Sequence, residues 1–237
     1  MISIWNPWHG CRKFSSGCIN CYMFRRDESV GRDPTVVSMT ASFELPLKKK
    51  QNGGWAIESM TDVFTCMTSD FFIEEADGWR DRAWEIMRLR PDLNFIIVTK
   101  RIHRASECLP GDWGSGYPNV MICCTVEDQL QCDKRMPIFK ALPAARKSIL
   151  CEPLLEEIDM SEYLDESFEY LSCGGESGPE ARECDFDWVL YLRDQCIDAY
   201  VPFEFHQTGA RFIKDGRLYH IPRKNQREQA KKANIDT

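Results

Sequence analysis

The 237-residue sequence contains no apolar run that approaches the roughly 20 residues needed to cross a bilayer. Its first ten residues, MISIWNPWHG, also lack a basic stretch followed by an apolar one, so they do not resemble a signal peptide. We therefore expect a cytoplasmic protein with no membrane partner.

Linkers and low-complexity segments are also missing. Hydrophobic residues make up 43% of the chain and charged residues 28%, as in ordinary globular domains. The sequence therefore predicts a single domain over residues 1–237, which is long enough to bury a sizeable core. Within it, residues 1–30 form a cysteine-bearing loop region and residues 210–237 a basic extension.

Short apolar runs bounded by turn residues recur along the chain and predict strands. They lack clean alternation, which is typical of strands covered on both faces of a parallel sheet. Helical patterns lie between several of them, at 73–90 and 185–199. The fold class we predict is α/β, a partial or full parallel (β/α) barrel with an N-terminal cysteine loop and a basic C-terminal helix. The strands are expected at 62–70, 94–101, 119–128, 147–154, 169–177 and 201–209, with a weaker one at 35–40.

Each expected strand ends in polar or charged residues. In a parallel βα barrel these ends share one rim, where active sites form. Strand ends are also polar simply because they run into loops, and any one of these residues could be a helix cap or an ion-pair partner. The candidate rim residues are Asp70, Lys100, Glu127, Glu152, Gly174, Gly175, Glu176 and Ser177.

The twelve cysteines need an explanation other than disulfides, which are rare in a reducing compartment. A thiol inside an apolar run behaves as a small hydrophobe. This interpretation assigns five of them to the core: Cys66, Cys123, Cys124, Cys151 and Cys173.

Packing does not explain Cys11, Cys18 and Cys21, which form C-x6-C-x2-C in a loop rich in Gly, Ser and Asn. Structural zinc sites usually take four ligands in two pairs, and the chain has no second C-x2-C. Although His9 could supply a fourth ligand, three thiolates with one open position suit an iron–sulfur cluster. A thiol redox pair of Cys18 and Cys21 is a third, weaker reading.

Neighbouring residues could support such a site. Gly10 and Gly17 would let the backbone wrap closely around a cluster. Trp5, Trp8 and Tyr22 would shield it from solvent, or would simply be core residues.

The sequence WNPWHGCRKFSSGCINCY resembles the opening of the phage Gp37/Gp68-type family, a three-cysteine domain of unassigned biochemical role. The resemblance continues in order through MTSDFF, VTKR, TVEDQ, LCEPL, GGESGPEAR, WVLYLRDQC and VPFEFHQTG, and so covers nearly the whole chain. That family is similar to radical S-adenosylmethionine (SAM) enzymes, which fold as full or partial βα barrels.

The resemblance implies a 4Fe–4S cluster held by Cys11, Cys18 and Cys21, whose free iron chelates SAM. Reductive cleavage of SAM then gives a 5′-deoxyadenosyl radical that abstracts hydrogen from a substrate. It also implies an electron donor such as flavodoxin or ferredoxin, and a bacterial or phage-infected host cytosol. The alternative is a zinc-stabilised binding module without redox chemistry.

The resemblance implies roles for the rim residues too. Gly174 and Gly175 would let the backbone approach a ligand, and Glu176, followed by Ser177, would receive an ammonium group. Ribose, carboxylate or substrate contacts would come from Asp70, Lys100, Glu127 and Glu152. Two features depart from the commonest pattern: the first cysteine gap is six residues instead of three, and the Gly-Gly-Glu segment follows the second-last strand instead of an early one.

Net charge is −7, yet residues 211–237 hold eight Lys and Arg against three acidic residues. A basic tail on an acidic body can contact a polyanion, although a solvated terminal helix has the same composition. With the phage association, the basic segment 211–232 favours a nucleotide or nucleic acid as the partner, while the sequence names no substrate and no catalytic residue.

Overall fold

The structure, a computed structural model, describes residues 1–237. It has two compact units, each built from separate stretches of chain. The first comprises Met1–Arg12, Asp27–Cys123 and Leu142–Arg146, and the second comprises Lys13–Arg26, Cys124–Ala141 and Lys147–Thr237. Cys11 therefore belongs to the first unit, whereas Cys18 and Cys21 belong to the second. The single domain stays a prediction.

Seven strands form one sheet in the order β1-β4-β5-β6-β7-β8-β10, and β6 carries residues of both units. In the first unit β1 pairs in parallel with β4, and β4 with β5. In the second, β8 pairs in parallel with both β7 and β10. The α/β class with parallel strands is therefore confirmed.

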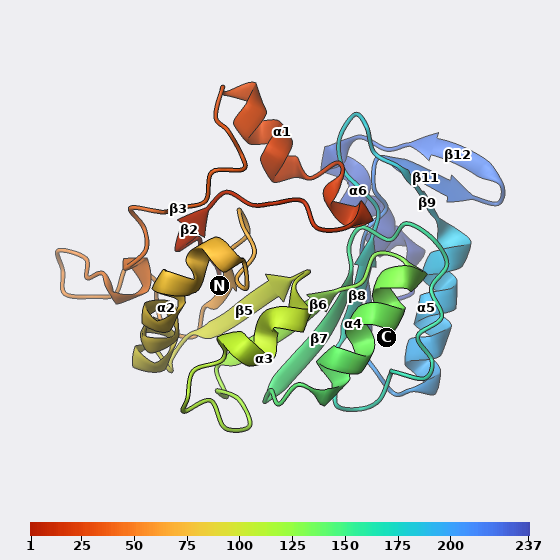
Figure 1. The fold of residues 1–237 in the computed structure, drawn as a ribbon. Coiled ribbons are helices and arrows are strands. Elements are labelled where there is room, and N and C mark those ends of the chain that lie inside the picture. Colours follow the sequence, from red (N-terminus) through yellow and green to blue (C-terminus); the bar gives the residue numbers. More distant parts are fainter. The chain divides into compact units, whose positions relative to one another are not determined.

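The first unit holds the N-terminal strands and the helices around β5 (Figure 1). Trp84 of α2 is fully buried and its ring lies 4.7 Å from that of Phe71 and 5.1 Å from that of Trp113. The elements are β1 (Ile2–Trp5), β2 (Trp8–His9), β3 (Ser38–Met39), η2 (Leu45–Leu47), β4 (Asp62–Thr65), η3 (Glu74–Ala76), α2 (Asp77–Leu89), β5 (Asn94–Thr99), η4 (Ile102–Arg104), α3 (Ala105–Cys108) and most of β6 (Val120–Thr125).

In the second unit, α5 packs against β8, β9, β10 and β11, and α6 packs against β10 (Figure 1). The elements are η1 (Ser16–Cys18), α4 (Gln129–Ala141), β7 (Arg146–Cys151), which begins at the last residue of the first unit, β8 (Leu171–Gly174), β9 (Glu183–Asp185), α5 (Phe186–Asp198), β10 (Phe203–Gln207), β11 (Arg211–Lys214), β12 (Arg217–His220) and α6 (Arg223–Ala233). Helix α1 (Tyr22–Ser29) has residues in both units.

Two expectations about secondary structure were wrong. The weak strand at 35–40 is the two-residue β3, which pairs antiparallel with β2 outside the seven-stranded sheet. The N-terminus already holds a sheet strand, β1. Residues 211–220 of the basic extension form an antiparallel hairpin, because Asp215 and Gly216 both take the positive φ that a tight two-residue turn requires. The predicted basic C-terminal helix is confirmed as α6.

None of the helices combines the length and the apolar character needed to span a bilayer.

Candidate functional site

Burial separates the twelve cysteines into two groups. Cys11, Cys18 and Cys21 are half-exposed, whereas the other nine are buried, and no cysteine forms a disulfide. The core assignment of Cys66, Cys123, Cys124, Cys151 and Cys173 is therefore confirmed.

Buried thiols resist ionisation because a thiolate is poorly solvated there. Burial raises the pKa of Cys66, Cys151 and Cys173 well above the usual range, and raises that of Cys132, Cys184 and Cys196 to about 12. These six thiols stay protonated and inert at neutral pH.

We use the name thiol loop for residues 11–21. Its residues 13–21 belong to the second unit and include a tight turn, in which the Cys21 N–H donates to the Cys18 carbonyl at 3.4 Å, before α1 begins at Tyr22. The Sγ atoms of Cys18 and Cys21 make no hydrogen bond. Two half-exposed thiols without hydrogen bonds, spaced C-x2-C, are a donor set that suits a thiophilic metal or an iron–sulfur cluster.

Glu127, which follows β6, anchors the thiol loop at its first half. Its carboxylate accepts hydrogen bonds from the Ser15 hydroxyl and, at 3.3 Å, from the Gly17 N–H. A Cβ at Gly17 would lie 2.9 Å from the Glu127 carboxyl carbon, so only glycine allows this approach. Glu127 is fully buried, and Arg135 of α4 donates to it from Nη1 at 2.7 Å.

Glu176, which follows β8, anchors the second half of the thiol loop. Its carboxylate accepts from the Asn20 side-chain amide at 3.0 Å and from the Arg182 N–H at 2.9 Å and Nε at 3.1 Å. Arg182 also donates to the Ser16 carbonyl at 2.9 Å. Although burial opposes ionisation, the bonds from Arg182 and Asn20 outweigh it and hold the pKa of Glu176 below its usual value. An ammonium ligand would have to displace these donors.

The Gly174-Gly175 pair allows the close packing of neighbouring strands. A Cβ at Gly174 would lie 2.9 Å from the Gln207 side chain, and one at Gly175 would lie 2.5 Å from the Thr208 carbonyl oxygen. Ser177 is also engaged, since its carbonyl accepts from Arg25 at 2.9 Å. The predicted ligand contacts of these residues stay predictions, and each residue has a structural role.

Glu152, which follows β7, pairs with His206 of β10. The His206 Nδ1 lies 2.9 and 3.0 Å from the two Glu152 carboxylate oxygens, and the Ser172 hydroxyl donates to the same carboxylate at 2.9 Å. The hydrogen bond to Glu152 raises the pKa of His206 above its usual value, against the lowering effect of burial.

In the first unit, Asp70 is buried and its carboxylate is saturated. It accepts from the Thr99 hydroxyl at 2.8 Å and from the N–H groups of Phe72 and Lys100 at 2.9 Å each. The Arg101 guanidinium lies 3.5 Å away, and it also lies 3.9 Å from the Cys11 Sγ. The Lys100 ammonium, by contrast, is half-buried and makes no ion pair or hydrogen bond.

The residues expected to surround the cysteines have other partners. The His9 Nε2 pairs with the Asp27 carboxylate at 2.5 Å, and both side chains are buried. Gly10 has a φ of +94°, and a Cβ there would lie 2.2 Å from the Val36 carbonyl oxygen. Trp5 and Trp8 are fully buried, so their interpretation as core residues is confirmed, whereas Tyr22 is 42% exposed.

Sequence reasoning did not select Asn20, Arg101, Arg182 or His206 as site residues. Arg101 and His206 do lie at the ends of predicted strands, and this position could have marked them as candidate site residues. No feature of the sequence marks Asn20 or Arg182, because their common partner Glu176 is 156 residues from Asn20 in the chain.

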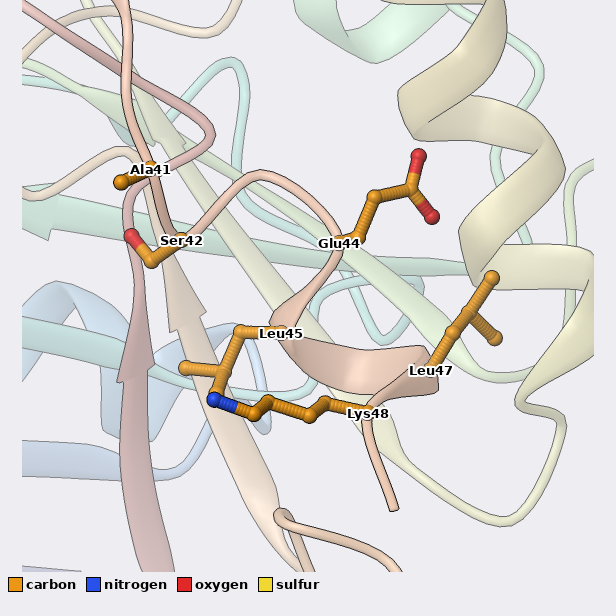
Figure 2. Close-up of a pocket in the computed structure, with 6 residues that line it drawn as sticks. All are labelled: Ala41, Ser42, Glu44, Leu45, Leu47 and Lys48. Carbon is orange, nitrogen blue, oxygen red and sulfur yellow. The ribbon is translucent and has the colours of Figure 1, made fainter.

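A surface hollow in the first unit lies around η2, lined by Ala41, Ser42, Glu44, Leu45, Leu47 and Lys48 (Figure 2). The Glu44 carboxylate is already bound by the Arg82 guanidinium through two hydrogen bonds of 2.9 and 2.8 Å. Glu44 is the only acid among the lining residues, and no histidine or cysteine accompanies it.

The structure contains no group of three or more His, Cys, Asp or Glu side chains arranged to hold a metal ion. What it does define is an α/β protein with parallel strands, in which strand-end carboxylates anchor a loop with two half-exposed thiols.

Residues 2–236 match the model of a family described as "Protein of unknown function (DUF5131)". The match covers nearly the whole chain, which therefore belongs to this family. Comparisons with curated proteins and with solved structures give no match.

Proposed function

We propose that this chain is a radical SAM enzyme whose 4Fe–4S cluster is held by Cys11, Cys18 and Cys21. In this proposal the chain folds as a partial parallel βα barrel, in keeping with its resemblance to the phage Gp37/Gp68-type family. One observation carries it: the three cysteines that are not buried are the three of the C-x6-C-x2-C motif.

When bound, such a cluster would supply the electron that cleaves SAM. The chain itself holds the thiol loop in place through Glu127 and Glu176, which fixes Cys18 and Cys21 before any metal arrives. The half-buried Lys100 ammonium has no partner and is suited to binding an anionic group of SAM or substrate. An external electron donor such as flavodoxin or ferredoxin completes the proposal.

The test compares Cys18→Ser with Cys108→Ser after anaerobic purification. Cys108 is 9% exposed and ends the short helix α3, which makes it a matched control outside the motif. We expect about four irons and four sulfides per chain in wild type and in Cys108→Ser, with an EPR signal on reduction that SAM perturbs. Cys18→Ser should lose that signal and most of its iron.

Two results would contradict the proposal. One zinc per chain, with no cluster after reconstitution with iron and sulfide, would establish the zinc-stabilised binding module. Cluster content that is equal in Cys18→Ser and Cys108→Ser would show that the motif does not ligate iron.

A polyanion partner is the second part of the proposal. Six exposed cations of the basic extension form no ion pair, whereas Arg211 pairs with Glu183 and Lys232 with Glu228. On a chain with net charge −7, unpaired cations gathered in one segment favour a nucleic acid as the partner. The six are Lys214, Arg217, Arg223, Lys224, Arg227 and Lys231.

We expect single-stranded DNA to bind with an affinity that falls steeply with salt. If all six cations contact phosphates, the slope of log K against log salt is about −4. Fluorescence anisotropy with a labelled oligonucleotide measures it. The double variant Lys224→Glu, Lys231→Glu should flatten the slope, whereas Lys134→Glu on α4 should not. A flat salt response in wild type removes the nucleic-acid partner.

A further inference from the structure

Glu152, one of the predicted ribose, carboxylate or substrate contacts, pairs with His206, and the geometry of this pair points to a ligand. Glu152 directly follows β7 and His206 lies near the end of β10, so both lie at the carboxyl edge of the second unit's strands. Crevices outside the carboxyl ends of parallel strands are where α/β proteins bind ligands. The two side chains are 22% and 29% exposed, which leaves them within reach of a small group.

The hydrogen bond to Glu152 fixes which ring nitrogen of His206 is available. A carboxylate only accepts hydrogen bonds, so Nδ1, at 2.9 and 3.0 Å from its two oxygens, must carry a proton. Nε2 has no hydrogen-bond partner. Because Glu152 favours the charged ring, Nε2 remains a hydrogen-bond donor over a wider pH range than it would in a free histidine.

Three charged groups act on the His206 ring: Glu152, Arg227 and Glu204. Glu152 is engaged at Nδ1. Glu204 lies two residues earlier on β10 and is exposed, so solvent screens its charge. Arg227 belongs to α6, which packs against β10, and its guanidinium makes no ion pair. The carbonyl of Gln226, next to Arg227, accepts from the Thr208 N–H at 3.3 Å, so this part of α6 lies against the end of β10 that carries His206. Two cationic donors at one strand end suit a tetrahedral oxyanion.

We propose that Nε2 of His206 and the guanidinium of Arg227 form a phosphate-binding site, with Glu152 as the residue that orients the imidazole. This assignment deepens the proposed polyanion contact, on which it rests, and does not require the cluster. The ligand class is a phosphate group, supplied either by the backbone of a nucleic acid or by a small phosphate.

The first experiment uses the full-length protein without iron and inorganic phosphate as the probe. The ring Cε1–H signals of His206 and of the exposed His220 on β12 are followed by NMR during a phosphate titration, with His220 as internal reference. We expect a saturable shift at His206 alone. Bound phosphate should raise the pKa of His206, because it favours the protonated ring.

Two variants test the assignment of residues. Arg227→Ala should weaken phosphate binding at least fivefold, while the matched change Lys231→Ala, one turn further along α6, should weaken it less than twofold. Glu152→Gln removes the charge that favours protonation, so we expect a lower pKa of His206. Its phosphate affinity, relative to wild type at the same pH, should fall at neutral pH and recover in acid, a recovery that a merely structural defect would not show.

A second probe separates the two sources of phosphate and the two proposals. An oligonucleotide without terminal phosphates should shift His206 if the ligand is a nucleic-acid backbone. A response to phosphate but not to the oligonucleotide keeps the site and removes the nucleic-acid partner. Equal, non-saturating shifts at His206 and His220, or an unchanged affinity in Arg227→Ala, would overturn the site. The pair would then only tie β7 to β10.

Discussion

Glu127→Ala is expected to lower the free energy of unfolding by about 3 to 5 kcal/mol, as measured by urea denaturation. Glu127 is fully buried and Arg135 is 3% exposed, so the variant leaves a guanidinium charge without its carboxylate in the interior. The Arg135 Nε already has no hydrogen-bond partner, which leaves the side chain little means of compensation.

Two controls isolate the cause. Glu58→Ala breaks the exposed ion pair with Lys50, in which Glu58 is 57% exposed, and should cost no more than about 1 kcal/mol. The double variant Glu127→Leu, Arg135→Met removes both charges and should regain most of the lost stability, because no buried charge then lacks a partner. A loss in Glu127→Ala as small as that in Glu58→Ala would contradict the buried-pair account.

The double variant also separates stability from the state of the thiol loop. It lacks the carboxylate that accepts from Ser15 and Gly17, so the loop should exchange its amide hydrogens faster than in wild type even though the protein is stable again. The amount of iron that the double variant incorporates should also fall, since Cys18 would no longer be held in place. Unchanged exchange over residues 13–21 would show that Glu127 does not anchor the loop.

Six of the seven strands of the sheet could be predicted from the sequence because each lies in a short apolar run bounded by turn residues, whereas β1 was missed. Their ends could not. The run 62–70 ends as a strand at Thr65, because Cys66 takes a φ of +61° that turns the chain out of the sheet. Helix α4 was not predicted for two reasons. Its buried face includes the polar residues Gln131 and Arg135, which interrupt the helical spacing of apolar residues, and Pro137 lies inside it.

Five of the nine buried cysteines were also predictable, since apolar neighbours mark a buried thiol. The partners of the strand-end carboxylates were not. Ser15 meets Glu127 across 112 residues and Asn20 meets Glu176 across 156, and no local pattern encodes such pairs. Polar strand ends therefore indicated where chemistry could occur, but the structure gives several of these side chains partners within the protein.

Asp70 provides the sharpest test of that distinction. Predicted as a ligand contact, it is 5% exposed, and its carboxylate accepts three hydrogen bonds and faces Arg101 at 3.5 Å. Asp70→Ala should therefore lower the free energy of unfolding by about 3 kcal/mol in protein without any ligand, because it leaves buried donors and a guanidinium unsatisfied. Urea denaturation of the ligand-free protein measures this.

Conservative variants refine the test of Asp70. Thr99→Val removes one donor and its bond, and should cost about 1 kcal/mol. Asp70→Asn keeps an oxygen for Thr99 and Phe72 but places an amide NH2 against the Lys100 N–H, so it should fall between Thr99→Val and Asp70→Ala. A residue that serves only to bind a ligand would leave the ligand-free protein as stable as wild type. That outcome in Asp70→Ala would return Asp70 to the ligand-binding role predicted from its place at the end of a strand.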